Sequence, residues 1–462
     1  MRVRVLGGIK PSANSYELNF EDGGGLSRRI LIDSGVDPST KEPHLKPSGP
    51  VDGVILTHAH FDHIGNVPFT FYENPKAWLM ASSTTFELSR LNWLDTLKIL
   101  MRDLKNKSND ISVAEFLYRF STGLKIANEN RRVLGKGGTI EIYPEVFVTC
   151  GSACHLPGAM WVEIEAEGKT VVFTGDWSFQ DRPTVLGTTL SELPKRIDAI
   201  FMDSTNGASD QRSLASEQER LLRDLKADLS EGRTVIEATL SFGKLPDMAV
   251  LMAQNGIDSY ADGSGIDTLL TTIGPEGKWD HTVDVSYRVE GLKNKNEFRS
   301  IRIGAGCIRL IDNDEQRRRL INTPGPKVIN APSGMLVGGR SVQYTKIFLA
   351  NPEARIYLTS YQAEGTPGRE LKGKIHTGGT ITMKDARGRF FKVSIRALVR
   401  DYNMSGHAAG TESVNAIRHL NPKETFLMHA EEESKRQLRE RLYNELGYDD
   451  AHIPELGEEI EI

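Results

Sequence analysis

Cysteine and long apolar runs are both scarce in this chain of 462 residues. Its three cysteines are too few for a disulfide framework, which favours a reducing compartment such as the cytoplasm. No stretch approaches the roughly 18 uninterrupted apolar residues that a membrane-spanning helix needs, and the first residues read as a strand rather than a signal peptide. These absences argue against a disulfide-stabilised secreted scaffold and against a helical membrane protein.

A strong excess of one charge sign is also missing from the chain as a whole, whose net charge is −5. Taken alone, this value argues against a polyanionic partner. The charge is unevenly spread, however, because residues 316–398 contain 15 Lys and Arg against four Asp and Glu. The whole-chain value therefore averages an acidic part with a basic stretch that has its own partner preference.

Short apolar runs rich in β-branched residues recur along the chain and predict buried strands. These runs lie at residues 2–6, 30–32, 54–57, 171–174, 199–202 and 425–428. Helical patterns lie between them, including a capping box that starts at Ser216 and a last helix over residues 432–446 that stops at Gly447. Mixed strands and helices predict an α/β protein, and the length allows two to four domains at roughly 100–200 residues each.

The strongest chemical signal is a histidine cluster that follows the predicted strand at residues 54–57. It places three imidazoles and one carboxylate within six residues, namely His58, His60, Asp62 and His63. Grouping such side chains is unfavourable unless a cation compensates for the lost solvation, and a divalent metal ion does so. In an extended loop His58 and His60 point the same way and can bind one ion, while Asp62 and His63 can turn towards a second.

Further metal ligands are available near other predicted strands. The candidates are Asp33, His155, Asp176, Asp203 and His429. Because polar residues at the carboxyl ends of strands meet at one edge of the sheets in α/β proteins, we expect these side chains to converge on the histidine cluster. Imidazole and carboxylate ligands suit zinc, and manganese or iron is the alternative.

The cluster His58-Ala-His60-Phe-Asp62-His63 resembles the signature of the metallo-β-lactamase fold. That resemblance implies an αββα sandwich with two zinc ions. The implied ligands are His58, His60 and His155 for one zinc, and Asp62, His63 and His429 for the other. Asp176 is then the bridge between the two ions, and Asp33 is a supporting residue that orients the histidine loop.

A long insertion separates Asp203 from the next histidine motifs, Ser405-Gly406-His407 and Met428-His429-Ala430. The insertion and its flanks resemble the β-CASP nucleases, in which Asp203, His407 and His429 match motifs A, B and C. A histidine at motif C is typical of the RNA-acting members, whereas the DNA-repair branch usually carries valine. Segments 331–340 and 360–369 resemble the branch of the cleavage and polyadenylation specificity factor endonuclease.

This resemblance implies a division of the chain into three parts. Residues 1–208 form the first part of the metallo-β-lactamase domain, 209–398 form the inserted α/β β-CASP domain, and 399–462 form the C-terminal part of the metallo-β-lactamase domain. The chain is expected to be a nuclease core without an N-terminal KH region or a long C-terminal extension.

The implied activity is zinc-dependent hydrolysis of single-stranded RNA by an endonuclease, with 5′–3′ exonuclease activity as a further possibility, in RNA processing or decay. His407 is the candidate general acid, because imidazole exchanges protons near neutral pH. Asp203 accepts the other N–H of that ring and fixes its orientation. Asp62 and Asp176 complete the catalytic set, and the implied products carry 5′-phosphate and 3′-hydroxyl ends.

Contacts with RNA are predicted in motif B and in the basic stretch. The candidates are Ser405, Gly406, Ser333, Gly334, Arg340, Tyr361 and Arg369. Structural roles are the alternatives, such as a tight turn at Ser333 or an inter-domain ion pair of Arg369. For the whole chain the alternatives are a non-cleaving RNA-binding subunit and a DNA-directed nuclease of the same fold. The protein partner expected for the chain is either a second copy, in a homodimer, or an RNA-processing complex.

Overall fold

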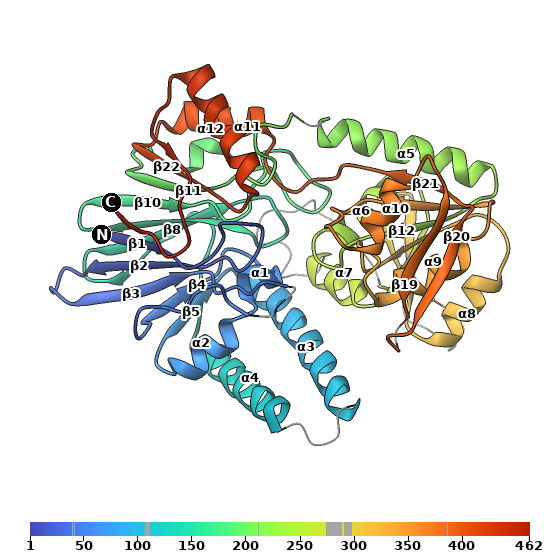
Figure 1. The fold of residues 1–462 in the computed structure, drawn as a ribbon, viewed down its shortest axis with the longest axis horizontal. Coiled ribbons are helices and arrows are strands. Elements are labelled where there is room, and N and C mark those ends of the chain that lie inside the picture. The colour runs from blue at the N-terminus through green and yellow to red at the C-terminus, as the bar shows by residue number, and fades with distance from the viewer. Residues whose placement is uncertain are drawn as a thin grey trace.

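A computed structural model describes residues 1–38, 40, 42–106, 111–210, 212–273, 289–290, 298–385 and 387–462. Figure 1 shows two lobes, a sandwich that holds both chain ends and an inserted lobe to its right. Within the described residues, no helix is both long and apolar enough to cross a membrane. The three cysteines are buried thiols, which agrees with the absence of a disulfide framework.

The sandwich consists of two seven-stranded sheets. The first has the order β24 (Glu459–Glu461), β1 (Arg2–Val5), β2 (Tyr16–Glu21), β3 (Ser27–Ile32), β4 (Gly53–Ile55), β5 (Trp78–Ala81), β6 (Arg131–Val133). The second has the order β23 (Ala451–His452), β22 (Glu424–Met428), β11 (Ala199–Asp203), β10 (Lys169–Phe173), β9 (Met160–Ala166), β8 (Val146–Ser152), β7 (Thr139–Tyr143). Strands β3 to β6 are mutually parallel, as are β10, β11, β22 and β23.

The two sheets pack face to face through a shared apolar core. Leu18, Ile55, Phe173 and Phe201 are buried in this layer, where the rings of Phe173 and Phe201 stack with centroids 5.0 Å apart. Helices cover the outer face of each sheet. The first sheet carries α1 (Phe61–Ile64), α2 (Val67–Glu73), α3 (Ser83–Asn106) and α4 (Ile111–Glu129), and the second carries η1 (Leu190–Glu192), α11 (Gly410–Leu420) and α12 (Glu432–Leu446). The predicted αββα sandwich is confirmed.

The inserted lobe is built on an eight-stranded sheet. Its order is β14 (Val289–Glu290), β15 (Arg299–Ile303), β16 (Gly306–Ile311), β13 (Ser259–Asp262), β17 (Lys327–Ala331), β12 (Thr234–Ala238), β18 (Ala354–Leu358), β21 (Leu398–Asp401). Strands from β16 to β21 in this order are parallel, which their crossover helices allow.

The helices of the inserted lobe are α5 (Leu214–Ser230), α6 (Lys244–Gln254), α7 (Gly265–Ile273), α8 (Asp314–Asn322), α9 (Gly339–Phe348) and α10 (Pro367–Gly373). A separate two-stranded sheet is formed by β19 (Gly379–Lys384) and β20 (Phe390–Ile395). In Figure 1, α5 runs along the top of the inserted lobe, and its first turn is the end nearer to the sandwich.

The predicted strands and helices are found with small shifts at their ends. The last helix has the predicted bounds, and Gly447 ends it in a left-handed conformation with φ of 64°. Helix α5 begins earlier than its predicted box, because Ser213 rather than Ser216 is the N-cap and accepts a hydrogen bond from the backbone N–H of Ser216. The predicted domain boundary at residue 398 lies at the first residue of β21, which pairs with β18 of the inserted sheet; the boundary stays a prediction.

Two titratable side chains, those of Glu237 and Lys244, are buried near the carboxyl end of β12. Burial raises the pKa of Glu237 to about 8, against the smaller lowering effects of Thr359 and Lys244. Burial also lowers the pKa of Lys244 well below its ordinary value. The folded protein therefore keeps the proton of Glu237 at pH values where an unfolded glutamate has already lost it, and the burial of this carboxyl costs stability as the pH rises.

Replacing Glu237 by Gln should remove this pH-dependent cost. Between the ordinary pKa of 4.5 and the raised value of about 8 the folded state binds more protons, so the wild-type free energy of unfolding falls by at most about 1.4 kcal/mol per pH unit. Denaturant unfolding should show Glu237→Gln gaining stability over wild type from pH 5 to pH 8. The control Glu219→Gln, on the exposed side of α5, should track wild type. An equal effect of Glu237→Gln at both pH values would contradict this account.

Candidate metal centre

The histidine cluster lies in the loop after β4 and in the short helix α1. His58 and His60 precede α1, whereas Asp62 and His63 belong to it. This loop is fixed by Asp33, which follows β3 and accepts hydrogen bonds from the backbone N–H and the hydroxyl of Thr57, each at 2.7 Å. The predicted supporting role of Asp33 therefore has a direct geometric counterpart, because the carboxylate holds the start of the histidine loop against β3.

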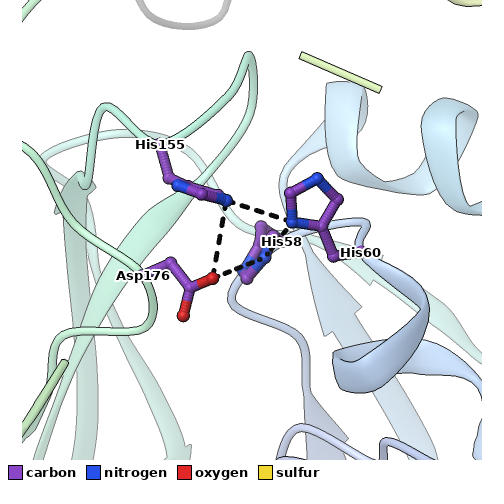
Figure 2. A group of neighbouring side chains, drawn as sticks. All are labelled: His58, His60, His155 and Asp176. Carbon is purple, nitrogen blue, oxygen red and sulfur yellow. Dashed lines mark hydrogen bonds and ion pairs between the residues drawn. The ribbon is translucent and has the colours of Figure 1, made fainter. Parts of the chain in front are cut away.

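One group of ligand-type side chains consists of His58, His60, His155 and Asp176 (Figure 2). His155 follows β8, and Asp176 follows β10. Nδ1 of His60 lies 3.2 Å from Nε2 of His58 and 3.0 Å from Nε2 of His155. Oδ2 of Asp176 lies 3.5 Å from Nε2 of His58 and 3.4 Å from Nε2 of His155. Figure 2 shows the four side chains pointing towards one common space.

A second group consists of Asp62, His63 and His429, and His429 follows β22. Oδ2 of Asp62 lies 3.7 Å from Nε2 of His63 and 3.3 Å from Nε2 of His429. Asp176 also reaches this group, because its Oδ1 lies 3.4 Å from Nε2 of His63 and 3.4 Å from Nδ1 of His429. The two oxygens of Asp176 thus face different groups, as expected of a residue between two ions.

Hydrogen bonds from the far ring nitrogens orient three of the histidines. Nδ1 of His63 donates to Oδ2 of Asp33 at 2.7 Å, and Nδ1 of His155 donates to the carbonyl oxygen of Gly406 at 2.8 Å. Nδ1 of His58 donates to the Thr57 hydroxyl oxygen at 3.1 Å, since that hydroxyl gives its own proton to Asp33. Each ring therefore directs Nε2 at the centre, which is the arrangement that metal-binding histidines adopt.

The donor set and its spacing fit divalent metal ions. Imidazole nitrogens and carboxylate oxygens are ligands that zinc accepts at about 2.0–2.2 Å, so ligands of a tetrahedral ion lie about 3.3–3.5 Å apart. The separations within the first group, 3.0 to 3.5 Å, fall close to that range. These side chains are nearly all buried, and a cation would compensate for the solvation they have lost.

The pKa shifts of these histidines differ between the two groups. Burial lowers the pKa of His58 and His155 well below the ordinary value, and lowers that of His60 to about 4. Burial acts in the same direction on His63, but the charges of Asp176 and Asp33 outweigh it and raise the pKa of that ring. The first group therefore offers neutral imidazoles, whereas the second holds protons in the absence of an ion.

Asp203 and His407 form a hydrogen-bonded pair beside the two groups. Nδ1 of His407 donates to Oδ2 of Asp203 at 2.8 Å. The backbone N–H and the hydroxyl of Thr205 donate to Oδ1 of Asp203, at 2.9 and 2.7 Å. Burial alone would raise the pKa of Asp203, but the charge of His407 and hydrogen bonds with His407 and His429 hold it well below the usual range. Asp203 is thus a fixed carboxylate that leaves Nε2 of His407 free to face the centre.

His407 lies close to the candidate ligands. Its ring centroid is 4.6 Å from that of His155 and 5.6 Å from that of His429. Ligand atoms of Asp176, Asp203, His407 and His429 also lie close enough to one another to form a third candidate group. His407 is 17 % exposed, whereas His58, His63, His155 and His429 are buried; of the rings around it, only that of His60 is also partly exposed.

The structure adds a buried ion pair that the sequence did not reveal. Arg182, in the loop after β10, donates from Nε to Oδ2 of Asp247 on α6 at 2.8 Å. Nη1 of the same guanidinium donates to the carbonyl oxygen of Ser405 at 3.3 Å. Arg182 therefore joins the sandwich, the inserted lobe and the segment that carries His407. Neither partner lies in a recognisable motif, and only their contact across 65 positions identifies them.

Asn206 is a second residue that sequence reasoning missed. Its side-chain amide donates to the Ser405 hydroxyl at 3.1 Å and to the carbonyl oxygens of His407 and Ala408 at 3.0 and 3.1 Å. The motif-B segment is thus held from two sides, by Arg182 and by Asn206. Within this segment the hydroxyl oxygen of Ser405 accepts a hydrogen bond from the backbone N–H of His407 at 3.3 Å. Position 406 is a glycine where a side chain would collide with His155.

Several predicted RNA contacts are already engaged within the inserted lobe. The Ser333 hydroxyl accepts the backbone N–H of Val337 at 2.9 Å, and Gly334 packs against Ser360, so both belong to a tight turn. Arg369 pairs with Glu364 at 2.7 Å. Arg340 lies 4.0 Å from Asp262 and 3.9 Å from Asp314. Tyr361 is 72 % exposed. The RNA-binding roles of these residues stay predictions.

Comparison with known families finds three matches in succession along the chain. The model of the metallo-beta-lactamase superfamily matches residues 13–217, and that of the Beta-Casp domain matches residues 284–371. Residues 392–454 match a model described as the Zn-dependent metallo-hydrolase RNA specificity domain. The described residues of the second match lie in the lobe inserted between the two parts of the sandwich.

Curated relatives share about a quarter of their residues with this chain. The transcription termination factor FttA of Methanosarcina mazei is 25% identical, with 96% of this chain and 69% of the factor covered. The same factor of Thermococcus kodakarensis is 26% identical, and this chain covers 65% of its length, so the chain spans about two thirds of these factors. Ribonuclease TTHA0252 of Thermus thermophilus is 25% identical, with 94% of both chains covered.

A solved structure of a protein of unknown function from Enterococcus faecalis superposes on 99% of both chains with a TM-score of 0.59 and 14% identity. At this identity the likeness concerns the fold alone. The family matches follow the order of the sandwich, the insertion and the return to the sandwich. The chain belongs to the β-CASP family of the metallo-β-lactamase superfamily.

Proposed function

We propose that the chain is a metal-dependent ribonuclease that hydrolyses phosphodiester bonds in single-stranded RNA, acting as an endonuclease. The observation that carries this proposal is the place of Asp176, between two groups of imidazoles and beside the Asp203–His407 pair. Relatives named as ribonucleases match the chain over most of its length, which supports the same chemistry here.

The proposed cofactor is a pair of zinc ions, and manganese is the alternative. His58, His60 and His155 would hold one ion and Asp62, His63 and His429 the other, with Asp176 shared between them. Bound there, such ions supply an activated water as nucleophile and positive charge against the phosphoryl oxygens. A non-cleaving RNA-binding subunit would be expected to lack several of the metal ligands that the family resemblance implies. This chain has a suitable residue at each of those positions, which favours a catalytic protein.

His407 would give its proton to the leaving 3′ oxygen of the RNA. Its Nδ1 is held by the carboxylate of Asp203, so the proton in transit is the one on Nε2. The ionised carboxylate stabilises the imidazolium ring before transfer and keeps the ring in place afterwards. Loss of the 3′ oxygen leaves a 3′-hydroxyl on one product and a 5′-phosphate on the other.

A small hollow lies beside His407, next to the proposed cleavage position. Its lining residues are Ser178, Gln180, Asn206, Arg212, Leu214, Asn403, Ser405, His407 and Ala409. Amide, hydroxyl and guanidinium groups of this kind bind phosphates and sugar hydroxyls without reading a base. Ser405 and Gly406 are proposed to contribute here. A resemblance to the cleavage and polyadenylation branch, and association with a second copy or an RNA-processing complex, stay predictions.

Cleavage of end-labelled RNA tests the proposed activity. Metal-loaded protein should convert single-stranded RNA into internal fragments, whether the 5′ end carries a monophosphate or a triphosphate. Release of mononucleotides only from 5′-monophosphate RNA would replace the endonuclease by an exonuclease. Faster cleavage of single-stranded DNA than of RNA would favour a DNA-directed nuclease, and RNA binding without any cleavage would contradict the proposal.

Replacing His407 by Ala should slow RNA cleavage by roughly 10²–10⁴-fold, because a positioned general acid contributes about that much. Metal content should stay at the wild-type level, since Asp176 and the other proposed ligands are untouched. The measurements are single-turnover cleavage and elemental analysis of the same preparation. The control His452→Ala changes an exposed histidine and should cleave normally. Wild-type cleavage by His407→Ala would rule out the general-acid role.

Metal affinity should weaken as the pH falls. In the ion-free protein burial opposes protonation of His429, but Asp176 and the other carboxylates raise its pKa to about 10, and the pKa of His63 is raised as well. A divalent ion must displace these protons, so the dissociation constant should rise about tenfold per pH unit for each proton released. Calorimetry with zinc at pH 6, 7 and 8, in buffers of different ionisation enthalpy, measures the dissociation constant and the number of protons released on binding. A pH-independent affinity would contradict the proposed ligand set.

A further inference from the structure

The hairpin of β19 and β20 lies in the basic stretch and contributes no residue to the candidate metal centre. Its two strands form a sheet of their own. One face is buried, because Ile381, Met383 and Val393 belong to the apolar core of the inserted lobe. Since side chains alternate along a strand, the opposite face is turned away from that core.

The outer face combines cations, hydroxyls and an aromatic ring. Three cross-strand pairs make it up: Thr380 with Ser394, Thr382 with Lys392, and Lys384 with Phe390. Phe390 is 70 % exposed, and Nζ of Lys384 lies 4.7 Å from the centroid of its ring. A phenylalanine left open to water beside a cation provides a flat apolar surface with positive charge at its side.

The charge of the hairpin is largely uncompensated. Residues 379–396 contain five Lys and Arg, and Asp385 is the single acidic residue among them. Asp385 pairs with Arg389. Across the part of the chain that the structure describes, Lys384, Arg387, Lys392 and Arg396 have no carboxylate within ion-pair distance.

The neighbouring cations of α10 differ from those of the hairpin. Lys372 pairs with Asp401 at 2.7 Å, and Lys374 is 2.5 Å from Glu370. Arg369 pairs with Glu364. Of these two elements, the hairpin rather than α10 therefore carries uncompensated positive charge.

The hairpin lies away from the metal centre. In Figure 1, β19 and β20 occupy the front and outer part of the inserted lobe, whereas α6 and α7 lie on the side nearer to the sandwich and its histidine cluster. A ligand bound on the outer face of the hairpin is therefore separate from the bond that the centre would cleave.

We propose that the outer face of the β19–β20 hairpin is a second contact surface for single-stranded RNA, with a base stacked on Phe390 and phosphates against Lys384 and Lys392. This inference rests on the proposed ribonuclease function and adds a surface that holds RNA outside the catalytic centre. Base stacking on an exposed ring together with nearby cations is the usual physical basis of single-strand binding. Lys384 and Lys392 are offset by two residues along the hairpin, or about 7 Å, so they can serve successive phosphates.

The test is a triple variant, Lys384→Gln, Phe390→Ala and Lys392→Gln, in the full chain. All three side chains are exposed, and thermal unfolding should confirm that the fold is unchanged. Fluorescence anisotropy of metal-free protein should show about tenfold or greater loss of affinity for an RNA of roughly 30 nucleotides, and no loss for one of roughly 8 that spans the centre alone. The slope of log K against log salt concentration should become shallower by about 1.4, because the variant lacks two cations that bind phosphates.

The matched control is Arg439→Gln with Tyr443→Ala on α12, which also removes an exposed cation and an exposed aromatic ring. This variant should bind both RNAs like wild type. Equal affinity of wild type and the hairpin variant for the long RNA would contradict the proposed RNA-binding surface. An equal loss of affinity for the long and the short RNA would contradict it as well. Binding of a polyglutamate peptide that depends on the hairpin, with RNA affinity unchanged, would assign it to an acidic protein segment instead and also overturn the proposal.

Cleavage assays separate this inference from the proposed function. The hairpin variant should cut the short RNA at the wild-type rate and the long RNA with a KM raised about tenfold and an unchanged kcat. If the wild type cuts RNA and the variant is indistinguishable from it, only the hairpin surface fails. If the wild type binds RNA through the hairpin but never cuts it, only the ribonuclease function fails.

Discussion

The carboxylate of Asp176 is buried, so its charge must be balanced by positive charge near both of its oxygens. The sandwich places imidazole rings on both sides of it. One oxygen faces His58 and His155, and the other faces His63 and His429. These residues come from different segments, which meet because the strands preceding them end at the same edge of two packed sheets. In the ion-free protein, protons on His63 and His429 offset part of the carboxylate charge, and divalent ions would do so more completely.

The placement of His407 depends on contacts between the lobes. The segment that carries it leaves the inserted lobe after β21 and re-enters the sandwich before α11. Arg182 fixes this segment through the carbonyl oxygen of Ser405 while its guanidinium is paired with Asp247 on α6. Removal of one partner from a buried ion pair leaves an uncompensated charge, so this contact couples the two lobes to the proposed general acid.

The candidate centre was largely predictable from the sequence, because its residues follow strands that the apolar pattern identifies. The four polar residues of the histidine loop, and His155, Asp176 and His429, lie together in the structure as predicted. Asp203 accepts the predicted hydrogen bond from His407, and Asp33 accepts one from His63, in the loop that it was expected to orient. The αββα sandwich with its insertion followed from the family resemblance of these same motifs.

Long-range pairing was not predictable in the same way. A local pattern shows where Arg369 and Lys372 lie along the chain, but not that Glu364 and Asp401 neutralise them. The Arg182–Asp247 pair carries no periodic or motif signal for the same reason. The exposed side of the hairpin becomes visible only when the strand register assigns Phe390 to the face opposite the core.

A crystal structure of zinc-loaded protein, with diffraction data collected at the zinc absorption edge, tests the central claim most directly. The account predicts two anomalous peaks, one among His58, His60, His155 and Asp176, and the other among Asp62, His63, His429 and Asp176. A single peak, or a peak on His407 in place of either group, would contradict a two-ion centre bridged by Asp176.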